Sequence, residues 1–101
     1  MAYYQPPRIT WDDPSASQGV KIERLMDDGN WYAWYVPHNG IVPHAMAADI
    51  LDVSAMTIHN WVASGKLGAL KWKGTPSLIP LREIKRVRKV LDRERQQREG
   101  K

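Results

Sequence analysis

The sequence contains no cysteine and no phenylalanine, and none of its apolar runs is long. The absence of cysteine excludes disulfide bonds and thiolate metal sites, and it agrees with a reducing, intracellular setting. The apolar runs are too short to span a bilayer, so we expect no membrane segment. The first seven residues also lack the basic start and the apolar core of a signal peptide. These absences together predict a cytoplasmic protein.

The residues that are present indicate one small folded domain. A chain of 101 residues, 43% of them hydrophobic, is long enough for a modest core. Its charge is unevenly distributed. Residues 1–40 carry three basic and five acidic residues, whereas residues 41–101 carry twelve basic and six acidic ones. The basic second half is expected to attract phosphate backbones, although a solvated basic helix has the same composition.

Residues that support catalysis or metal binding are scarce. The histidines are His38, His44 and His59, and no acidic residue stands at metal-ligand spacing beside the first two. No phosphate-binding glycine loop, glycine-flanked nucleophile or paired-carboxylate site is present. We therefore expect no enzyme activity, metal, cofactor or small-molecule substrate, and we interpret the histidines as unrelated surface residues.

Two segments are predicted before residue 41. Residues 1–19 contain three prolines and little periodicity, so we expect a flexible arm, attached to the domain through Ile9 or Trp11. Residues 20–37 predict a β-hairpin, because an Asp-Gly turn separates two runs rich in β-branched and aromatic residues.

The second run of this hairpin is strongly aromatic, with Trp31, Tyr32, Trp34 and Tyr35. Interleaved aromatic residues are able to stack on single-stranded bases. Since the chain has no phenylalanine, we expect these rings to supply core volume in one small sheet. If they are exposed instead, they form an interaction patch.

The centre of the chain predicts two short helices joined by a tight turn. Apolar positions between Pro43 and Leu51 have helical spacing, and Pro43 suits the first turn of a helix. Asp52 stands at the turn and tolerates the left-handed conformation. A second helix is expected from its N-cap Ser54 to about Ala63. The buried stripe of this helix is predicted to be Ile58, Trp61 and Val62.

A two-stranded hairpin is predicted next. Gly65 ends the second helix because glycine accepts the left-handed conformation. Strands are expected at residues 66–73 and 77–80, with a turn at residues 74–76. Trp72 stands between lysines, and we expect its ring to pack on the core or the sheet rather than on nucleic acid.

A last helix is expected from Leu81. Its apolar stripe ends at Leu91, so fewer than two heptads are apolar and a coiled coil is not favoured. Residues 92–101 are polar and are expected to form a charged helix end or tail.

Several of these positions together resemble the MerR-like and excisionase-like winged helix-turn-helix domains. The resemblance covers residues 41–91 and implies an α+β fold of three helices and a two-stranded wing. From the aromatic run at residues 31–35 we expect the N-terminal hairpin to join the wing sheet. Two positions depart from the family: Pro43 replaces a capping serine or threonine, and Asp52 replaces the turn glycine. The matching positions are Ala47, Ala48, Leu51, Val53, Ser54, Thr57, Ile58, Trp61, Ser64, Gly65, Lys66, Leu67, Ile79 and Pro80.

The resemblance implies that the second helix enters a DNA major groove while the wing contacts the backbone or minor groove. Asn60 is suited to pair with adenine, and Met56 to contact a thymine methyl group. The predicted DNA-contacting residues are Ser54, Ala55, Met56, Thr57, His59, Asn60, Lys66, Lys71, Lys73, Thr75, Arg82 and Arg86.

The expected function is sequence-specific binding of duplex DNA, by a small bacterial or phage transcription regulator or excisionase-like recombination factor associated with the nucleoid. Alternatives are a small-terminase-like packaging subunit, and a protein-interaction module that uses the aromatic hairpin and the basic last helix. One such module buries little DNA surface, so self-association or a protein partner is expected to support tight binding.

Overall fold

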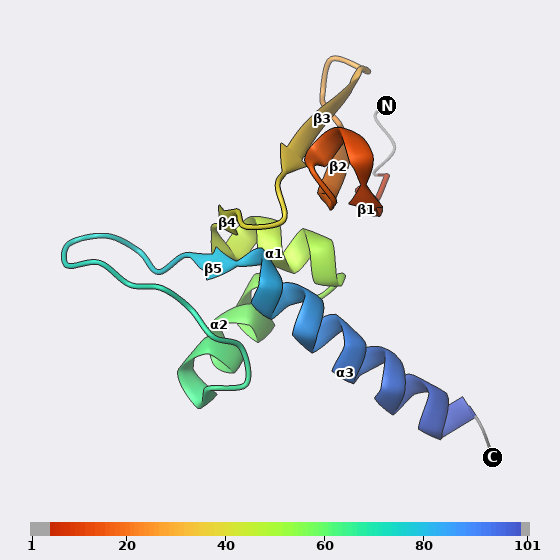
Figure 1. The fold of residues 1–101 in the computed structure, drawn as a ribbon. Coiled ribbons are helices and arrows are strands. Elements are labelled where there is room, and N and C mark those ends of the chain that lie inside the picture. The colour runs from red at the N-terminus through yellow and green to blue at the C-terminus, as the bar shows by residue number, and fades with distance from the viewer. Residues whose placement is uncertain (1–4, 100–101) are drawn as a thin grey trace.

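The computed structural model describes residues 5–99. Within them lie three helices and two antiparallel sheets, one of order β1-β2-β3 and one of β4 with β5, so the α+β class is as predicted. Figure 1 shows the three-stranded sheet at one end, the helices on one side of it, and a long loop between α2 and β5 that projects away. The elements are β1 (Arg8–Asp13), the 3-10 turn η1 (Pro14–Ala16), β2 (Gly19–Leu25), β3 (Trp31–Val36), β4 (Ile41–Val42), α1 (His44–Leu51), α2 (Ala55–Ser64), β5 (Ile79–Pro80) and α3 (Leu81–Glu99).

The first sheet is a meander in which β2 pairs with both neighbours. Ile22 of β2 lies opposite Ile9 of β1 and Trp34 of β3, so these three side chains share one face. The turn between β2 and β3 contains Gly29 at a φ of 83°, a conformation that glycine adopts without strain. β2 and β3 occupy the segment for which the sequence predicts a hairpin.

Residues 5–19 differ from the flexible arm that the sequence suggests, because six of them form β1. Lys85 of α3 holds the end of this strand: its Nζ donates to Asp12 Oδ1 at 2.8 Å and to the Gln18 carbonyl at 3.0 Å. Arg88 of α3 lies 4.2 Å from the centre of the Trp11 ring. The segment is ordered by these partners far away in the sequence, which local composition does not reveal.

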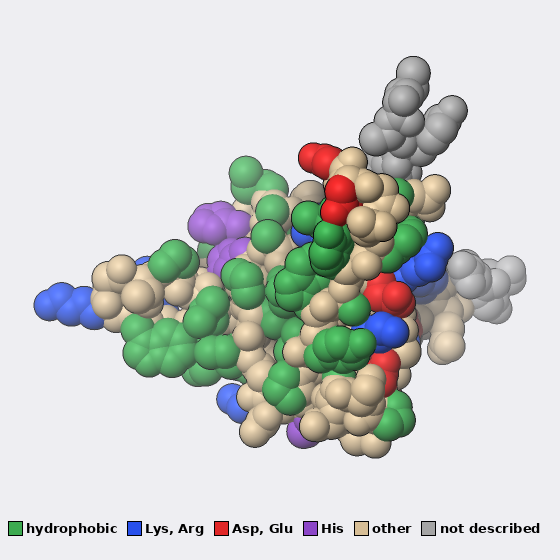
Figure 2. All heavy atoms as spheres, turned by 90° about the horizontal axis from the view of Figure 1, so that it is seen from above, with side chains coloured by type: hydrophobic (Ala, Val, Ile, Leu, Met, Phe, Trp, Pro, Cys, Tyr) green, Lys and Arg blue, Asp and Glu red, His purple; other side chains and the backbone are tan. Residues whose placement is uncertain are grey.

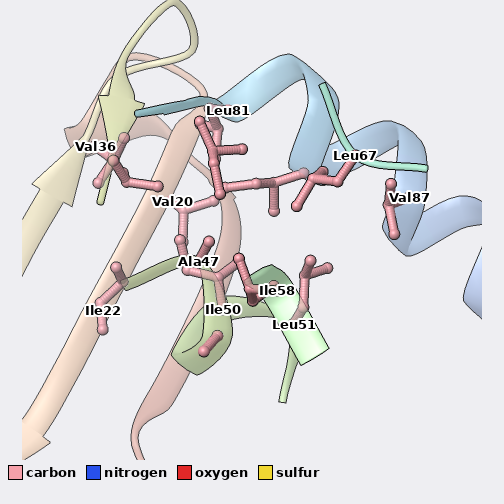
Figure 3. Close-up of a cluster of buried hydrophobic side chains, with 14 residues drawn as sticks. Val20, Ile22, Val36, Ala47, Ile50, Leu51, Ile58, Leu67, Leu81 and Val87 are labelled. Atoms are coloured by element: carbon pink, nitrogen blue, oxygen red, sulfur yellow. The ribbon is translucent and has the colours of Figure 1, made fainter. Parts of the chain in front are cut away.

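One apolar core joins the sheet to the helices. Val20, Ile22 and Val36 of the sheet are buried together with Ala47 and Ile50 of α1, as Figure 3 shows. The sheet is therefore part of the same domain as the helices. The other members of the core are Val42, Ala48, Leu51, Ile58, Leu67, Ile79, Leu81, Ile84 and Val87.

Helices α1 and α2 form a helix-turn-helix. Asp52 ends α1 in the left-handed conformation, with φ 56° and ψ 50°, as the sequence predicts. The Oγ of Ser54 accepts a hydrogen bond from the Thr57 N–H at 3.1 Å and so caps α2. Gly65 ends α2 at a φ of 83°. Pro43 lies at the N-cap of α1, one residue before the first helical turn in which it was expected.

The stripe of α2 that was predicted to be buried, Ile58, Trp61 and Val62, is buried only in part. Ile58 is fully buried, whereas Trp61 and Val62 are half-buried and pack at the margin of the core. Trp61 lines a shallow hollow with Val53 and Leu91. The stripe thus faces inward as expected, and the large indole lies at its edge.

The loop of residues 65–78 differs from the predicted two-stranded hairpin. Its pairing is a single bridge, in which the N–H groups of Leu70 and Leu78 each donate to the other's carbonyl at 2.7 and 2.8 Å. Beyond this bridge the loop is exposed and has no apolar face to bury. Residues Ile79–Pro80 pair with β4 instead, since the buried Val42 and Ile79 lie opposite each other. The strand that joins β5 is therefore β4, and the N-terminal hairpin forms a separate sheet.

Two predictions of buried aromatic rings are wrong. Tyr32, Trp34 and Tyr35 of β3 are 45%, 39% and 52% exposed, and Trp72 is 48% exposed. The core is filled by smaller branched side chains, and the rings of the edge strand β3 are left largely uncovered. Trp72 lies beyond the last backbone pair of its loop, so no sheet surface is available to it.

Helix α3 packs its first turns on the core through Ile84 and Val87, while Leu91 is half-buried. The helix continues beyond Leu91 to Glu99 as a polar extension. No helix of residues 5–99 combines the length and apolarity needed to cross a membrane.

Because the sheet completes the core, replacing Ile22 should destabilise the whole domain. We expect Ile22→Ala to lower the free energy of unfolding by about 2–4 kcal/mol, since it leaves a cavity at a fully buried site. Urea denaturation followed by circular dichroism measures the change. Leu25→Ala, on the other face of β2, is the control and should cost clearly less. Separate unfolding transitions for sheet and helices would contradict the shared core.

Candidate nucleic-acid interface

The outer face of α2 presents short and flexible side chains to solvent. Met56 is 67% exposed, and Ala55, His59 and Asn60 are exposed as well. The amide of Asn60, the imidazole of His59 and the thioether of Met56 are groups that fit base edges rather than phosphates. Four of the predicted contact residues are thus brought together on one helix face.

Two further predicted contact residues have a structural task at the start of α2. The Oγ of Ser54 lies 2.9 Å from the Oγ1 of Thr57 and accepts from the Thr57 N–H. Thr57 is half-buried by this arrangement. The pair fixes the first turn of the helix, so its effect on any ligand is mainly through the orientation of α2.

Two histidines that the sequence analysis treated as unrelated lie side by side. The ring centres of His44 on α1 and His59 on α2 are 6.3 Å apart. The Nε2 of His44 also lies 2.7 Å from the Oγ of Ser77, at the end of the 65–78 loop. This contact ties the loop to the start of α1 and to the outer face of α2. Ser77 was missed because no local signal links it to a residue 33 positions earlier.

Among residues 5–99, no group of three or more His, Cys, Asp or Glu side chains is arranged to hold a metal ion.

The tip of the 65–78 loop is basic and aromatic. Lys71, Trp72 and Lys73 are all exposed there, and Figure 2 shows basic and hydrophobic side chains along the projecting loop. The turn is closed by Thr75, whose N–H and Oγ1 both donate to the Trp72 carbonyl at 3.1 and 3.0 Å. Gly74 adopts a φ of 81° in this turn. A tip with two cations is suited to contact a phosphate backbone.

The base of the loop is clamped by Glu83 and Arg86 of α3. Glu83 Oε1 accepts the Gly68 N–H at 2.8 Å, and an Arg86 Nη donates to the Lys66 carbonyl at 2.7 Å. The two side chains also form a salt bridge at 2.8 Å. A Cβ on Gly68 would lie only 2.8 Å from Glu83 Oε1, so a larger residue there would displace the Glu83 carboxylate. We call this arrangement the Glu83–Arg86 clamp.

The clamp perturbs the charges of both partners. The Arg86 guanidinium, followed by the Gly68 N–H, lowers the pKa of the Glu83 carboxyl below its ordinary value. Glu83 in turn raises the pKa of Arg86. Arg86 was predicted to contact DNA, but its guanidinium is bound by Glu83 and the Lys66 carbonyl of the same chain. Half of its side chain stays exposed.

Lys66 lies apart from the outer face of α2. Its Nζ is 4.7 Å from the centre of the Trp61 ring, on the flank of α2 that also faces Leu91. A cation over an indole is a stabilising contact at a partly exposed site. The structure therefore separates Lys66 from the predicted residues Met56, His59 and Asn60.

The outward face of α3 is a basic stripe. Arg82, Arg86, Lys89 and Arg93 follow helical spacing and are exposed. They line a shallow groove to which His38 of the β3–β4 connection also contributes. Arg82, at the start of α3, is the member nearest in sequence to the 65–78 loop. The stripe adds a second positive surface to that of the loop tip.

One family model matches the part of the chain that contains the helix-turn-helix. Residues 45–89 match the family model described as a helix-turn-helix domain. This segment includes α1, α2, the 65–78 loop and the first half of α3, and it supports a helix-turn-helix domain that binds DNA. Searches of curated proteins and of solved structures found no match.

The clamp leads to a pH-dependent prediction. Because the pKa of Glu83 is lowered in the folded state, its ionised form stabilises the fold above its ordinary value of 4.5. That contribution is lost as the pH falls through the lowered pKa. We expect Glu83→Gln to lower the free energy of unfolding by about 1–2 kcal/mol at neutral pH and by much less at about pH 3. Urea titrations at both pH values measure this.

Glu94→Gln, an exposed glutamate on the same helix, is the matched control and should have little effect at either pH. An equal loss for the two variants, or a loss for Glu83→Gln that persists in acid, would contradict the role of the clamp.

Proposed function

We propose that this protein binds duplex DNA sequence-specifically, with α2 in the major groove and the 65–78 loop acting as a wing on the adjacent backbone or minor groove. The observation that carries the proposal is the division of chemistry between the two elements. The outer face of α2 has amide, imidazole and thioether groups suited to base edges. The loop tip has the lysines Lys71 and Lys73.

The readout by α2 would depend on three side chains. Asn60 offers one donor and one acceptor that match the adenine edge in the major groove. Among residues 5–99, Met56 is the most exposed of the large apolar side chains, and it suits a thymine methyl group. His59 is exposed on α2 next to His44 of α1, where it would meet a base edge or a phosphate.

The loop tip would supply sequence-independent affinity. Lys71 and Lys73 neutralise phosphates and release counterions, which makes binding sensitive to salt. Between them, the exposed Trp72 is free to lie along the sugar edge of the groove. The His44–Ser77 contact and the Glu83–Arg86 clamp would hold this loop at a fixed angle to α2, which a two-part grip on DNA requires.

Within this class, a small transcription regulator or an excisionase-like recombination factor fits best. One domain of this size buries little DNA surface, so tight binding would need a second copy, a neighbouring site or bending of the DNA. The exposed aromatic strand β3 favours a protein contact as well, and so supports the alternative of an interaction module or a subunit of a packaging assembly.

The proposal is tested by fluorescence polarisation with duplex DNA across a salt series, after selection of a preferred sequence from a random oligonucleotide pool. We expect the logarithm of the binding constant to fall steeply with the logarithm of salt concentration. Lys71→Ala with Lys73→Ala should reduce this slope by about 1–2 and weaken all sequences alike, since each lost phosphate contact contributes about 0.9.

Asn60→Ala should behave differently. We expect it to cost about 1–3 kcal/mol on the selected site, to relax preference at one base pair, and to leave the salt slope unchanged. Arg24→Ala with Arg95→Ala, two exposed residues outside the loop and the α3 stripe, is the charge-matched control for the loop variant. An equal loss from that control would show that binding depends on net charge alone, and the absence of duplex binding at low salt would refute the proposal.

A further inference from the structure

The free edge of β3 lacks the features that normally prevent strand pairing. Within residues 5–99, β3 pairs only with β2, and it does so in continuous register from Trp31 to Val36. The strand contains no charged residue, no proline and no irregularity. Protein edges are usually protected by one of these.

The opposite edge of the same sheet provides the contrast. Strand β1 has a register shift between Trp11 and Asp13, and Asp12 within it adopts a φ of 53°. It also carries the charged residues Arg8, Asp12 and Asp13. One edge of the sheet is thus protected in two ways, whereas the other is regular and uncharged.

The aromatic residues of β3 are symmetric about Ala33. Trp31 and Tyr35 lie two residues on either side of it and project to the outer face of the sheet. Tyr32 and Trp34 are its immediate neighbours and project to the face that bears the helices. Tyr32, Trp34 and Tyr35 are 39–52% exposed, and Trp31 is half-buried beneath the Arg8 guanidinium at 3.9 Å.

The backbone of β3 is available at the same positions. The Met26 N–H donates to the Asn30 carbonyl at 2.9 Å, which makes this a hydrogen-bonded pair of the hairpin. Since such pairs alternate along an antiparallel ladder, residues 32, 34 and 36 direct their N–H and carbonyl groups to β2. Trp31, Ala33 and Tyr35 therefore direct theirs outward, away from the sheet.

We propose that β3 pairs with β3 of a second copy of this chain, antiparallel about a two-fold axis through Ala33. In this register the two Ala33 residues lie opposite each other, Trp31 lies opposite Tyr35 of the other copy, and Tyr32 lies opposite Trp34. All outward backbone groups of the three odd-numbered residues find partners. The result is a six-stranded sheet with an isologous interface.

Charge and area are both compatible with this partner. A two-fold axis places like residues near one another, and an uncharged strand meets no repulsion there. Each exposed ring leaves roughly 100 Å² uncovered, given aromatic areas of about 200 Å² and exposed fractions near one half. The six rings of the two copies together offer about 600 Å², to which the paired backbone adds, so the contact lies at the small end of specific interfaces and a weak dimer is expected.

The shape of the molecule leaves room for the second copy. Figure 1 shows the β2–β3 turn directed away from the helices, so antiparallel pairing places the second set of helices beyond that turn. If the proposed DNA-binding function also holds, two such domains would read half-sites arranged as an inverted repeat. The dimer itself does not depend on that function.

Sedimentation velocity of the full chain without DNA, from about 1 to 300 µM, tests the proposal. We expect a monomer–dimer equilibrium. Ala33→Lys places two ammonium groups at the axis and should weaken the dimer by at least about tenfold. The matched control is Thr10→Lys, an exposed position in the middle of β1, which should leave the dimer unchanged.

A cysteine variant gives a second readout that does not depend on tolerance of a charge. The natural chain has no cysteine. The Cα atoms of facing residues in a hydrogen-bonded pair are about 5.5 Å apart, a distance that a disulfide bond can span. Ala33→Cys should form a disulfide-linked dimer under mild oxidation, whereas Thr10→Cys should not. A chain that stays monomeric at 300 µM and fails to crosslink through Ala33→Cys overturns the proposal and leaves the edge to a strand of another protein. A dimer unaffected by Ala33→Lys overturns it also.

Discussion

Helix α1 is buried against the N-terminal sheet, and this contact supports both short helices of the domain. Helices of eight and ten residues are too short to be stable alone in water. Val20, Ile22 and Val36 supply the apolar surface that α1 needs, and α1 in turn supports α2 through Ala47 and Ile58. Without the sheet, the helix-turn-helix would have an open side. The domain is therefore one cooperative unit of sheet and helices.

This shared core also determines how the candidate interface is presented. Because Ile58 is the point at which α2 is buried, the opposite side of a ten-residue helix is left free for Met56, His59 and Asn60. The 65–78 loop has almost no core of its own, and its position is defined by polar contacts at its base. The Glu83–Arg86 clamp and the His44–Ser77 contact fix it from two sides. Apolar burial thus holds α2, whereas hydrogen bonds and a salt bridge hold the loop.

The two edges of the sheet differ for a physical reason that links fold to assembly. β1 is held by Lys85 and Arg88 of α3, and its irregular, charged edge cannot accept another strand. β3 has its aromatic rings on both faces and its backbone directed outward. Core volume therefore does not explain the aromatic residues, since branched residues fill the interior, and their symmetry about Ala33 indicates a surface contact.

Features that depend on near neighbours could be predicted from the amino-acid sequence alone. Chemistry within one helical turn explains the N-cap Ser54, the left-handed Asp52, the helix end at Gly65 and the inward stripe around Ile58. The segment that matches the family model, residues 45–89, contains all four features. Contacts between residues far apart in the chain became visible in the folded molecule. Folding paired residues 8–13 with β2, exposed Tyr35 and Trp72, placed Lys66 over Trp61, and gave Arg86 a partner in the loop. These outcomes depend on contacts across many residues and on the limited space of a small core, which local patterns do not encode.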